Sequence, residues 1–464
     1  MLFPLLISLY YGELSDVYSF GISATATFVA GAAMTFGIRP TNKSMRKREG
    51  LMLTAVVWVF FSAFGMLPYL ISGIFTSVTD AFFETMSGFT TTGSSLITDV
   101  ESLSHGIIFW RAATQWLGGM GIILFTLAVL PMLNYKGGIA LFNAEVTGIT
   151  HERMRPRVSQ TAKDLWLVYI GLSVILFALL LKPMGWFDSV CHTMTTMSTG
   201  GFSTKNLGLH HWHSSYIYVV VMVFMFLGGM NFALLFSMLR GRFYRLRHND
   251  TFRFYIVIIF VVASLIIVRM WHYNFFESWS DRVIFAFFDT IAATTSTGFT
   301  SVNYEASGEF IAIILMVLMF FGGMAGSTSG GAKIDRFLVM MKNTRNEFFR
   351  VLHANAVTAV RIDGRAIPQQ VVSKAIAFLS IYMMVMGAGA IILTFFGLPM
   401  FDSLFTSLSA LSNFGFGYGV TAAPGSYALL PAAAKWFLAF EMLVGRLELF
   451  TVLIIFTRGF WLKD

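Results

Sequence analysis

The turn Thr90-Thr91-Thr92-Gly93 is the first of four related short turns, and each of them is followed by a long apolar stretch. The turn glycines are 107, 98 and 117 residues apart, which is too regular for chance and too long for a solenoid repeat. The pattern predicts four internal repeats, each built around one such turn. The other three of these glycine turns are Met197-Ser198-Thr199-Gly200, Thr295-Ser296-Thr297-Gly298 and Ser412-Asn413-Phe414-Gly415.

The composition is that of a membrane protein. Hydrophobic residues make up 56% of the 464 positions, and charged residues only 12%. Lipid offers the backbone no hydrogen-bond partners, so membrane-spanning stretches must be helical, and the sequence predicts an all-α integral membrane protein. Nine stretches approach the length of roughly 20 residues that crosses a bilayer. They are 17–38, 51–74, 107–131 (interrupted by Gln115), 164–181, 214–239, 254–271, 309–325, 372–396 and 432–457.

The basic residues indicate the orientation of the chain. The net charge is +8, but 25 of the 32 Lys and Arg residues lie in five segments that alternate with the glycine turns. The positive-inside rule places these segments in the cytoplasm and the turns outside, and we expect a multi-pass protein of the bacterial inner membrane. The distribution argues against nucleic-acid binding and leaves contact with membrane lipid or a partner protein open. The segments are 39–48, 136–163, 240–253, 333–374 and 458–463.

The chain divides into an entry segment at 1–38 and four units of one design. Each unit has a helix, a short re-entrant stretch, a glycine turn and a second helix. The entry segment begins with Met1–Tyr11, which is apolar but too short to span, and we expect it to be the end of a longer first helix. The units are predicted to span 50–131, 163–240, 252–340 and 371–458.

The re-entrant stretches precede the turns. In the first two, an aspartate is followed after four residues by Thr-Met. A short helix running inward would point its carboxyl end, with about half a negative charge, at the membrane centre, where four such ends would stabilise a cation. The acidic residues near the starts of these helices are either helix caps or groups that concentrate cations at the outer mouth. They are Asp80, Asp188, Asp289 and Asp402.

The glycine turns themselves predict a cation selectivity filter. Glycine permits backbone angles that direct carbonyl oxygens inward, and rings of carbonyls replace the hydration shell of an ion. No acidic residue lies within the four turns, which favours a monovalent over a divalent ion. The predicted ligands of a transported potassium ion are Thr91, Thr92, Gly93, Ser198, Thr199, Gly200, Ser296, Thr297, Gly298, Asn413, Phe414 and Gly415.

The third repeat contains a polar break at Gly326-Ser327-Thr328-Ser329-Gly330-Gly331. It is not a nucleotide-binding P-loop, because Ala332 precedes Lys333 and Ile334 stands where Ser or Thr would bind magnesium. The break is either a plain end of a helix or a flexible loop below the filter that gates the pore.

Arg446 lies in the middle of an apolar stretch of the fourth repeat. An arginine costs at least about 2.5–3.5 kcal/mol at the centre of a membrane helix, so it must face a carboxylate or a cavity. Glu441 and Glu448 are candidate partners, and the alternative is a fixed positive charge in the pore that limits ion flux.

Small residues recur in the second helices. Gly118-Gly119, Gly228-Gly229, Gly322-Gly323 and Gly445 hold corresponding places. Close packing between helices explains such glycines, and a hinge in each helix is the second explanation.

Nothing in the sequence indicates an enzyme. The single Cys191 excludes a disulfide within the chain, and His192 is predicted to be an ordinary polar residue. No catalytic set and no covalent cofactor are predicted. A membrane-embedded enzyme or a flippase is the rival from another class, and it would need a catalytic polar set that is not evident.

The repeats, the turn Thr91-Thr92-Gly93 with Ser94, the fourth turn and Arg446 resemble the TrkH/TrkG/KtrB superfamily of potassium transporters, related to plant HKT proteins. The resemblance covers nearly the whole chain, although Phe414 replaces the hydroxyl residue before the fourth glycine. It implies a pseudo-fourfold pore, a homodimer, an intramembrane gate at 326–331 and a cytoplasmic TrkA/KtrA-like subunit that binds nucleotide.

Two alternatives within transport stay open. A sodium-permeable or sodium-coupled pore of the HKT or KtrB kind is the first, and Gly93 argues against it, because a serine there would weaken potassium selectivity. The second concerns the mode of transport, since flux is either passive or a symport with protons.

Overall fold

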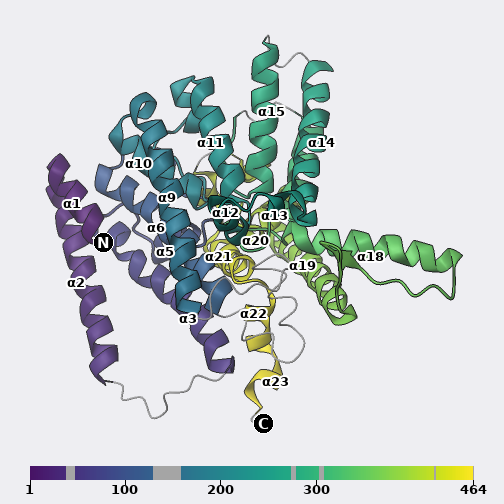
Figure 1. The fold of residues 1–464 in the computed structure, drawn as a ribbon. Helices are drawn as coiled ribbons and strands as arrows, with labels where there is room; N and C mark the ends of the chain where they lie inside the picture. Colours follow the sequence, from purple (N-terminus) through teal and green to yellow (C-terminus); the bar gives the residue numbers. More distant parts are fainter. Residues whose placement is uncertain (38–46, 129–157, 273–277, 302–307, 423–424, 463–464) are drawn as a thin grey trace.

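The computed structural model describes residues 1–37, 47–128, 158–272, 278–301, 308–422 and 425–462. Helices dominate this part of the chain (Figure 1). A two-stranded antiparallel hairpin, β1 (Arg361–Ile362) with β2 (Arg365–Ala366), accompanies them. The prediction of an all-α membrane fold is therefore confirmed.

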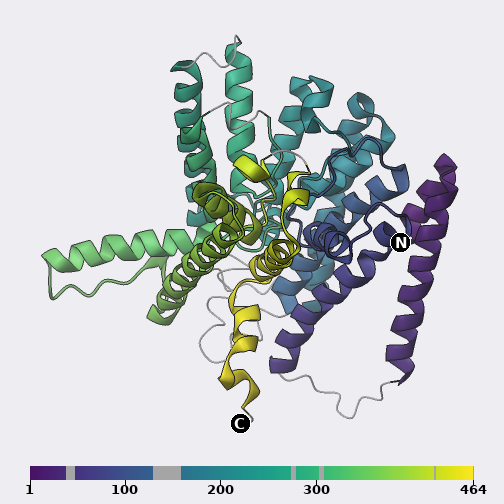
Figure 2. The same cartoon turned by 180° about the vertical axis from the view of Figure 1, so that it is seen from behind.

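The entry segment forms two helices, α1 (Leu2–Tyr11) and α2 (Leu14–Gly37). Gly12 ends α1 in the left-handed conformation, with φ of 74°. The two helices pack on each other at the edge of the molecule, and α1 also contacts α6 (Figures 1 and 2).

Each repeat contains a long helix, a short re-entrant helix of 12 to 16 residues, and a second helix. The first repeat is α3 (Lys47–Gly65) with α4 (Leu67–Ile71), α5 (Val78–Phe89) and α6 (His105–Ala128); the second is α9 (Val158–Met184), α10 (Trp186–Met197), α11 (Ser215–Gly228) and α12 (Phe232–Leu239); the third is α14 (Asp250–His272), α15 (Trp279–Thr294), α17 (Glu309–Phe321) and α18 (Ile334–Leu352); the fourth is α19 (Gln369–Phe395), α20 (Met400–Leu411) and α21 (Ala432–Arg446).

Shorter helices connect and follow these elements. They are α13 (Tyr244–Arg247), α22 (Phe450–Leu453), α23 (Arg458–Trp461) and the 3-10 turns Gly208–Trp212, Gly419–Thr421, Ser426–Leu429 and Ile454–Phe456.

The four repeats close into a ring. The second helix of each repeat packs on the re-entrant helix of the next one: α6 on α10, α11 on α15, α17 on α20, and α21 back on α5. This cyclic contact brings the carboxyl ends of all four re-entrant helices to the middle of the molecule. Helix α18 instead projects sideways from the bundle, as both ribbon views show (Figures 1 and 2).

Three of the nine predicted stretches, 214–239, 309–325 and 432–457, are not single continuous helices in the structure. Among the described residues, five helices are long and apolar enough to cross a membrane, or six if α11 and α12 form one span bent by 106°. Helix α17 has only 13 residues, and α21 ends at Arg446. Hydropathy detects apolar composition but not the backbone breaks inside these stretches.

The glycine pairs explain both the packing and the breaks. Helix α6 is continuous across Gly118, where a Cβ would lie 1.8 Å from the carbonyl oxygen of Phe89 at the end of α5. In the second and third repeats the pairs coincide with helix ends, and Gly322 has φ of 69°. Close packing therefore accounts for the first repeat, while the middle repeats use their glycines to interrupt the helix.

Candidate functional site

The four glycine turns share one backbone conformation. A residue with φ between 52° and 54° is followed two positions later by a glycine with φ between 76° and 88°. At the second position only glycine adopts these larger φ angles without strain, so a side chain is disfavoured there. The left-handed residues are Thr91, Thr199, Ser296 and Asn413, and the glycines are Gly93, Gly201, Gly298 and Gly415.

The second turn is one residue out of register with the sequence-based prediction. Gly201, rather than Gly200, is the equivalent of Gly93. The hydrogen bonds agree, because Thr92 N donates to Ser87 O at 2.9 Å and Gly200 N donates to Thr195 O at 2.8 Å. In the sequence, Gly200 is the first glycine after the hydroxyl residues, which aligns it with Gly93. The backbone conformation instead requires glycine one position later, at Gly201.

This shift changes the predicted set in the second repeat. Thr199, Gly200 and Gly201 correspond to Thr91, Thr92 and Gly93, whereas Ser198 corresponds to Thr90, before the left-handed residue.

Backbone carbonyls link the four turns in a closed cycle of contacts. A Cβ on each turn glycine would lie 2.0 to 2.2 Å from the carbonyl oxygen of a neighbouring repeat, so these glycines also make room for the ring. The contacts run in sequence around all four repeats and return to the first. The pairs are Gly93 with Gly200 O, Gly201 with Thr297 O, Gly298 with Phe414 O, and Gly415 with Thr92 O, and we call these four oxygens the carbonyl ring.

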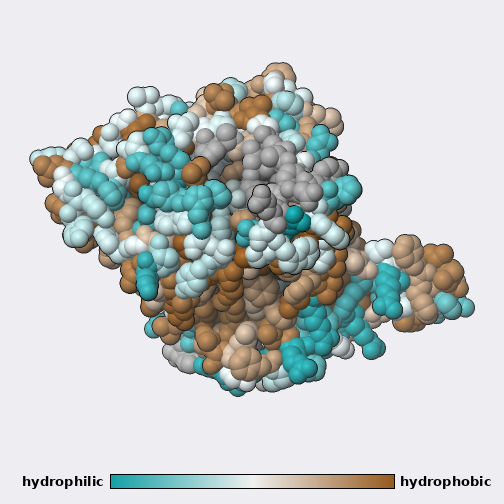
Figure 3. Space-filling model, turned by 90° about the horizontal axis from the view of Figure 1, so that it is seen from above, coloured by the Kyte–Doolittle hydropathy of each residue, from teal (hydrophilic) through white to brown (hydrophobic). Residues whose placement is uncertain are grey.

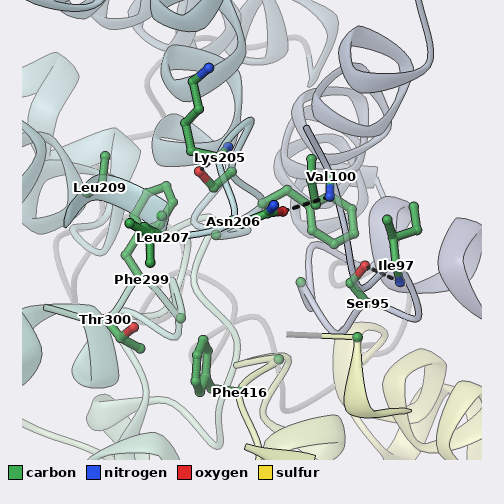
Figure 4. Close-up of a pocket in the computed structure, with 18 of the residues that line it drawn as sticks. Ser95, Ile97, Val100, Lys205, Asn206, Leu207, Leu209, Phe299, Thr300 and Phe416 are labelled. Carbon is green, nitrogen blue, oxygen red and sulfur yellow. Dashed lines mark hydrogen bonds between the residues drawn. The ribbon is translucent and has the colours of Figure 1, made fainter. Parts of the chain in front are cut away.

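A cavity of about 610 Å³, the vestibule, lies on one side of the ring, and all four turn glycines line it. In Figure 4, Ser95, Ile97 and Val100 line one wall and Phe299, Thr300 and Phe416 lie across the cavity from them. Asn206 joins two repeats there, because its Oδ1 accepts from Val100 N at 2.7 Å. Among the described residues no carboxylate lines the vestibule, and its charged lining residues are Arg111 and Lys205.

The aspartates near the starts of the re-entrant helices neither cap the helices nor line the vestibule. Asp80 pairs with Lys435 at 2.7 Å, Asp188 accepts from Thr204 Oγ1 at 2.7 Å, and Asp402 accepts from Val420 N at 2.9 Å. Asp289 lies one turn further along its helix and is 2% exposed. Asp80 thus joins its re-entrant helix to α21, and the other carboxylates hold following segments to theirs, which the sequence patterns did not reveal.

Asp289 belongs to a second equivalent position. Nine residues before each turn glycine, a buried polar side chain reaches the segment that follows the turn. Asp289 accepts from Ser301 N and Oγ at 3.0 and 2.8 Å, and His192 Nε2 lies 3.1 Å from Ser203 Oγ. His192 is thus part of the scaffold around the ring rather than an isolated polar residue. The four members are Glu84, His192, Asp289 and Thr406.

Glu84 also forms a buried ion pair with Arg111, which the sequence patterns did not indicate. Its Oε1 lies 3.0 Å from Arg111 Nε, and the two side chains are 0% and 3% exposed. Arg111 lies in the apolar stretch 107–131, where any ionisable residue signals a functional or structural partner.

The segment 322–333, which we call the intramembrane loop, lies on the other side of the ring. Thr328 Oγ1 donates to Met197 O at 3.1 Å, and Gly331 N donates to Ser412 O at 3.0 Å. These contacts place the loop against the second and fourth turns. The cavity between the loop and Arg446 is only about 20 Å³, room for about one water molecule.

The break between α11 and α12 holds the intramembrane loop by backbone pairing. Met324 N donates to Gly229 O at 2.9 Å, and Phe232 N donates to Gly326 O at 3.1 Å. Asn231 has two roles: its Oδ1 accepts from Leu234 N and caps α12, while its Nδ2 donates to Ala325 O at 2.7 Å. The loop is therefore fastened to the second repeat.

Arg446 points at the intramembrane loop and not at a glutamate. Its Nη1 donates to Thr328 O at 2.7 Å, and its Nη2 donates to Gly118 O at 3.4 Å. Glu448 pairs instead with Arg336 at 2.6 Å, and Glu441 accepts from Ser407 Oγ at 2.8 Å. Neither candidate glutamate pairs with Arg446, and its buried guanidinium instead binds carbonyls of the intramembrane loop and of α6.

Comparisons with known proteins agree with this geometry. The TrkH family model, described as cation transport protein, matches residues 19–460. The chain belongs to the TrkH family of cation transport proteins. It is 34% identical over 469 residues to the Trk system potassium uptake protein TrkH of Escherichia coli strain K12, covering 99% of this chain and 95% of that protein. The TrkG protein of the same strain is 29% identical with the same coverage.

A solved TrkH-family structure has the same fold. The crystal structure of the potassium transporter TrkH from Vibrio parahaemolyticus superimposes with a TM-score of 0.91 at 31% identity, covering 100% of this chain and 96% of that one. The resemblance stated from the sequence is thus confirmed. As a TrkH-family member the chain is a multi-pass transport protein and not an enzyme. Its membership of this family and its helical spans agree with the expected inner-membrane location.

Proposed function

We propose that this protein takes up potassium through the carbonyl ring, with the four repeats at 50–131, 163–240, 252–340 and 371–458 surrounding one pore. The observation that carries the proposal is the closed ring of four carbonyls, each packed against a turn glycine of a neighbouring repeat. Relatives named potassium uptake proteins support the choice of ion. The ion is a transported substrate, held by backbone oxygens with Thr92, Gly200, Thr297 and Phe414 contributing the ring.

A neutral ring suits a weakly hydrated monovalent cation. Within the described residues, no group of three or more His, Cys, Asp or Glu could hold a metal ion, and the ring has only backbone oxygens. Such ligands compensate the loss of a loose hydration shell more easily than that of a small or divalent ion. Gly93 at the first turn favours potassium over the sodium-permeable alternative.

Purified protein in liposomes tests this function. Fluxes of potassium, rubidium, sodium and lithium are compared with and without a pH gradient. We expect potassium and rubidium to pass in preference to sodium and lithium. Equal sodium and potassium flux would favour an HKT-like or KtrB-like function, and flux only with a pH gradient would make the protein a proton symporter.

The intramembrane loop is proposed to gate the pore, together with Arg446. The loop, including Gly326 to Gly331, lies directly below the turns and leaves room for about one water molecule. Ser327, Ser329 and Gly330 line that small space with Arg446. The positive charge disfavours a cation resting there while the loop is closed.

Replacing Asn231 by serine is expected to raise basal potassium flux about fivefold, because one hydrogen bond of about 1 kcal/mol to the loop is lost. Serine keeps an oxygen that caps α12 but cannot reach Ala325 O. Flux of the purified variant in liposomes measures the effect.

Asn231→Ala is the matched variant, since it loses both the cap and the contact with the loop. It should conduct like Asn231→Ser but melt at a lower temperature. Basal flux unchanged in both variants would mean that this contact does not hold the gate.

Regulation by a cytoplasmic subunit is part of the proposal. The name "Trk system" on the relatives fits an assembly of several components. A TrkA/KtrA-like subunit that binds nucleotide would contact α18 and move the loop that precedes it. Arg153, Arg155 and Arg157 of the basic segment 136–163, for which contact with a partner protein stays open, lie outside the described residues.

Helix α18 offers a surface for such a partner and for a second copy of the chain. Its end is apolar as well as basic, with Phe348, Val351 and Leu352 exposed by 69%, 83% and 79%. Figure 3 shows the projecting arm, with many brown atoms on it. An exposed apolar patch of this kind marks an interaction site, which supports the proposed homodimer. Lipid would cover the apolar helices around the bundle, such as α2 with Phe28 at 76% exposure.

Charge reversal of Arg345 and Arg350 is expected to weaken co-purification of the regulatory subunit at least tenfold and to abolish nucleotide-dependent flux, because a basic face would become acidic. Arg350 already pairs with Glu347 at 2.8 Å, so Arg345 is the cleaner single site. Lys342→Glu is a poor choice, because Lys342 holds Asp250. A full nucleotide response of the purified chain alone would contradict the proposal.

A further inference from the structure

The carbonyl ring is not equivalent at all four positions. Three of its residues carry side chains, Thr92, Thr297 and Phe414, whereas the fourth is Gly200. Gly200 has no positive φ, so its backbone does not require glycine. Another feature must account for the missing side chain.

Gln115 of α6 occupies the space where a side chain of Gly200 would lie. A Cβ on Gly200 would be 2.4 Å from Cδ, 2.5 Å from Oε1 and 2.8 Å from Nε2 of Gln115. Gln115 is fully buried, and it is a polar residue in a mostly apolar membrane stretch. Burying a carboxamide there is costly unless its polar atoms are hydrogen-bonded.

Both polar atoms of Gln115 bind the second turn. Its Nε2 donates to Gly200 O at 2.6 Å, and its Oε1 accepts from Phe202 N at 3.2 Å. Within the described part of the chain, Gly200 O is the one ring carbonyl that accepts a hydrogen bond from the protein. The first repeat thus clamps the two-glycine segment of the second.

The other turns are held by their own side chains. Thr92 Oγ1 lies 2.8 Å from Thr90 Oγ1, and Thr297 Oγ1 lies 2.6 Å from Thr295 Oγ1. Phe414 is 2% exposed and anchors the fourth turn by packing. Gln115 holds the Gly200 segment in place, as these side chains do in the other three turns.

We propose that Gln115 is a positioning residue that determines ion selectivity. The inference rests on the proposed function of the ring. The carboxamide holds Gly200 O and thereby fixes the position of one ligand. Because this oxygen already accepts a hydrogen bond, it is a weaker ligand for the ion than the other three ring oxygens. A ring with one loosened carbonyl would adapt to a smaller ion, and discrimination against sodium would fall.

Two exchanges test the clamp. Gln115→Met keeps the length and shape of the side chain but makes no hydrogen bond to Gly200 O or Phe202 N. Gly200→Thr introduces the residue that the first and third turns carry, and it must collide with Gln115. The double variant Gln115→Ala with Gly200→Thr removes the collision and supplies the turn with a side chain of its own, and Gln115→Ala alone completes the double-mutant cycle.

The first measurement is the ratio of potassium to sodium flux in liposomes. We expect Gln115→Met to lower this ratio about three- to tenfold while total flux stays within about twofold. We expect Gly200→Thr to lose at least about tenfold in potassium flux, and the double variant to recover most of it, which a double-mutant cycle reports as strong coupling. An unchanged ratio in Gln115→Met, or a double variant no better than Gly200→Thr, overturns the proposal.

The second measurement separates this inference from the proposed function. Thermal melting of the purified proteins is followed as potassium chloride replaces choline chloride, because an ion that binds the folded state stabilises it. Gln115→Met should need more potassium for the same stabilisation. If wild-type protein neither conducts nor responds to potassium, the proposed function fails, and the clamp is then judged from the coupling in melting temperature between positions 115 and 200. Absence of that coupling would refute the clamp by itself.

Discussion

Replacement of Gly201 by serine should abolish potassium-selective flux, with a loss of at least tenfold in the potassium-to-sodium ratio. Gly201 has φ of 76°, where a residue with Cβ costs about 1–2 kcal/mol. The new Cβ would also lie 2.0 Å from Thr297 O, so a ring carbonyl would have to move. Ion flux ratios in liposomes, together with the yield of folded protein, measure the result.

Gly73→Ser is the matched control for this prediction. Gly73 has φ of 78°, almost the same strain, but nothing lies within 4 Å of its Cβ position. It should retain selectivity and lose only some stability. The same substitution at Gly93, where φ is 88° and Gly200 O lies 2.2 Å away, should resemble Gly201→Ser. If selectivity survives at Gly201, then Gly201 is not part of the ring, and the register derived from the backbone fails.

Removal of Ser327, Thr328, Ser329 and Gly330 from the intramembrane loop should raise basal potassium flux at least tenfold. The shortened loop can no longer lie under the second and fourth turns, where Thr328 Oγ1 binds Met197 O and Gly331 N binds Ser412 O. Its hydrogen bonds each contribute about 1 kcal/mol, so losing several shifts the balance of closed and open states by more than one order of magnitude. Flux without nucleotide or partner is the relevant measurement.

Ser327→Ala serves as the control, because Ser327 lines the small space beside Arg446 but its Oγ donates to Met324 O within the loop, at 2.6 Å, and not to either turn. It should leave basal flux near the wild-type value. The potassium-to-sodium ratio of the shortened protein should also stay unchanged, since the ring lies on other segments. Equal or lower flux from correctly folded, shortened protein would show that the loop does not close the pore.

Much of the fold could be predicted because its signals are local in the sequence. Apolar stretches must form helices in lipid, so composition alone predicted the all-α class. The regular spacing of the turns predicted fourfold repetition. The family resemblance depended on the same residues, Thr91 to Gly93 and Arg446, and the comparisons confirmed it.

The register of the second turn could not be predicted, because Gly200 and Gly201 are chemically identical in a sequence. Only the structure distinguishes Gly201, which needs glycine for its positive φ, from Gly200, whose side-chain position is occupied by Gln115. The partner of Arg446 was missed for a similar reason. Glu448 is only two residues away in the chain, but the carbonyl of Thr328 comes from another repeat.

The sequence by itself determined the helical class, the four repeats and the glycine turn in each of them, because these follow from hydropathy, spacing and the steric freedom of one residue type. The tertiary structure alone decided which carbonyls meet, which acids hold which loops, and that the α11–α12 break holds the intramembrane loop. The contacts between repeats join residues about 85 to 355 positions apart, such as Gln115 with Gly200 and Asp80 with Lys435. Such pairs arise only when the second helix of each repeat packs against the next repeat and closes the ring.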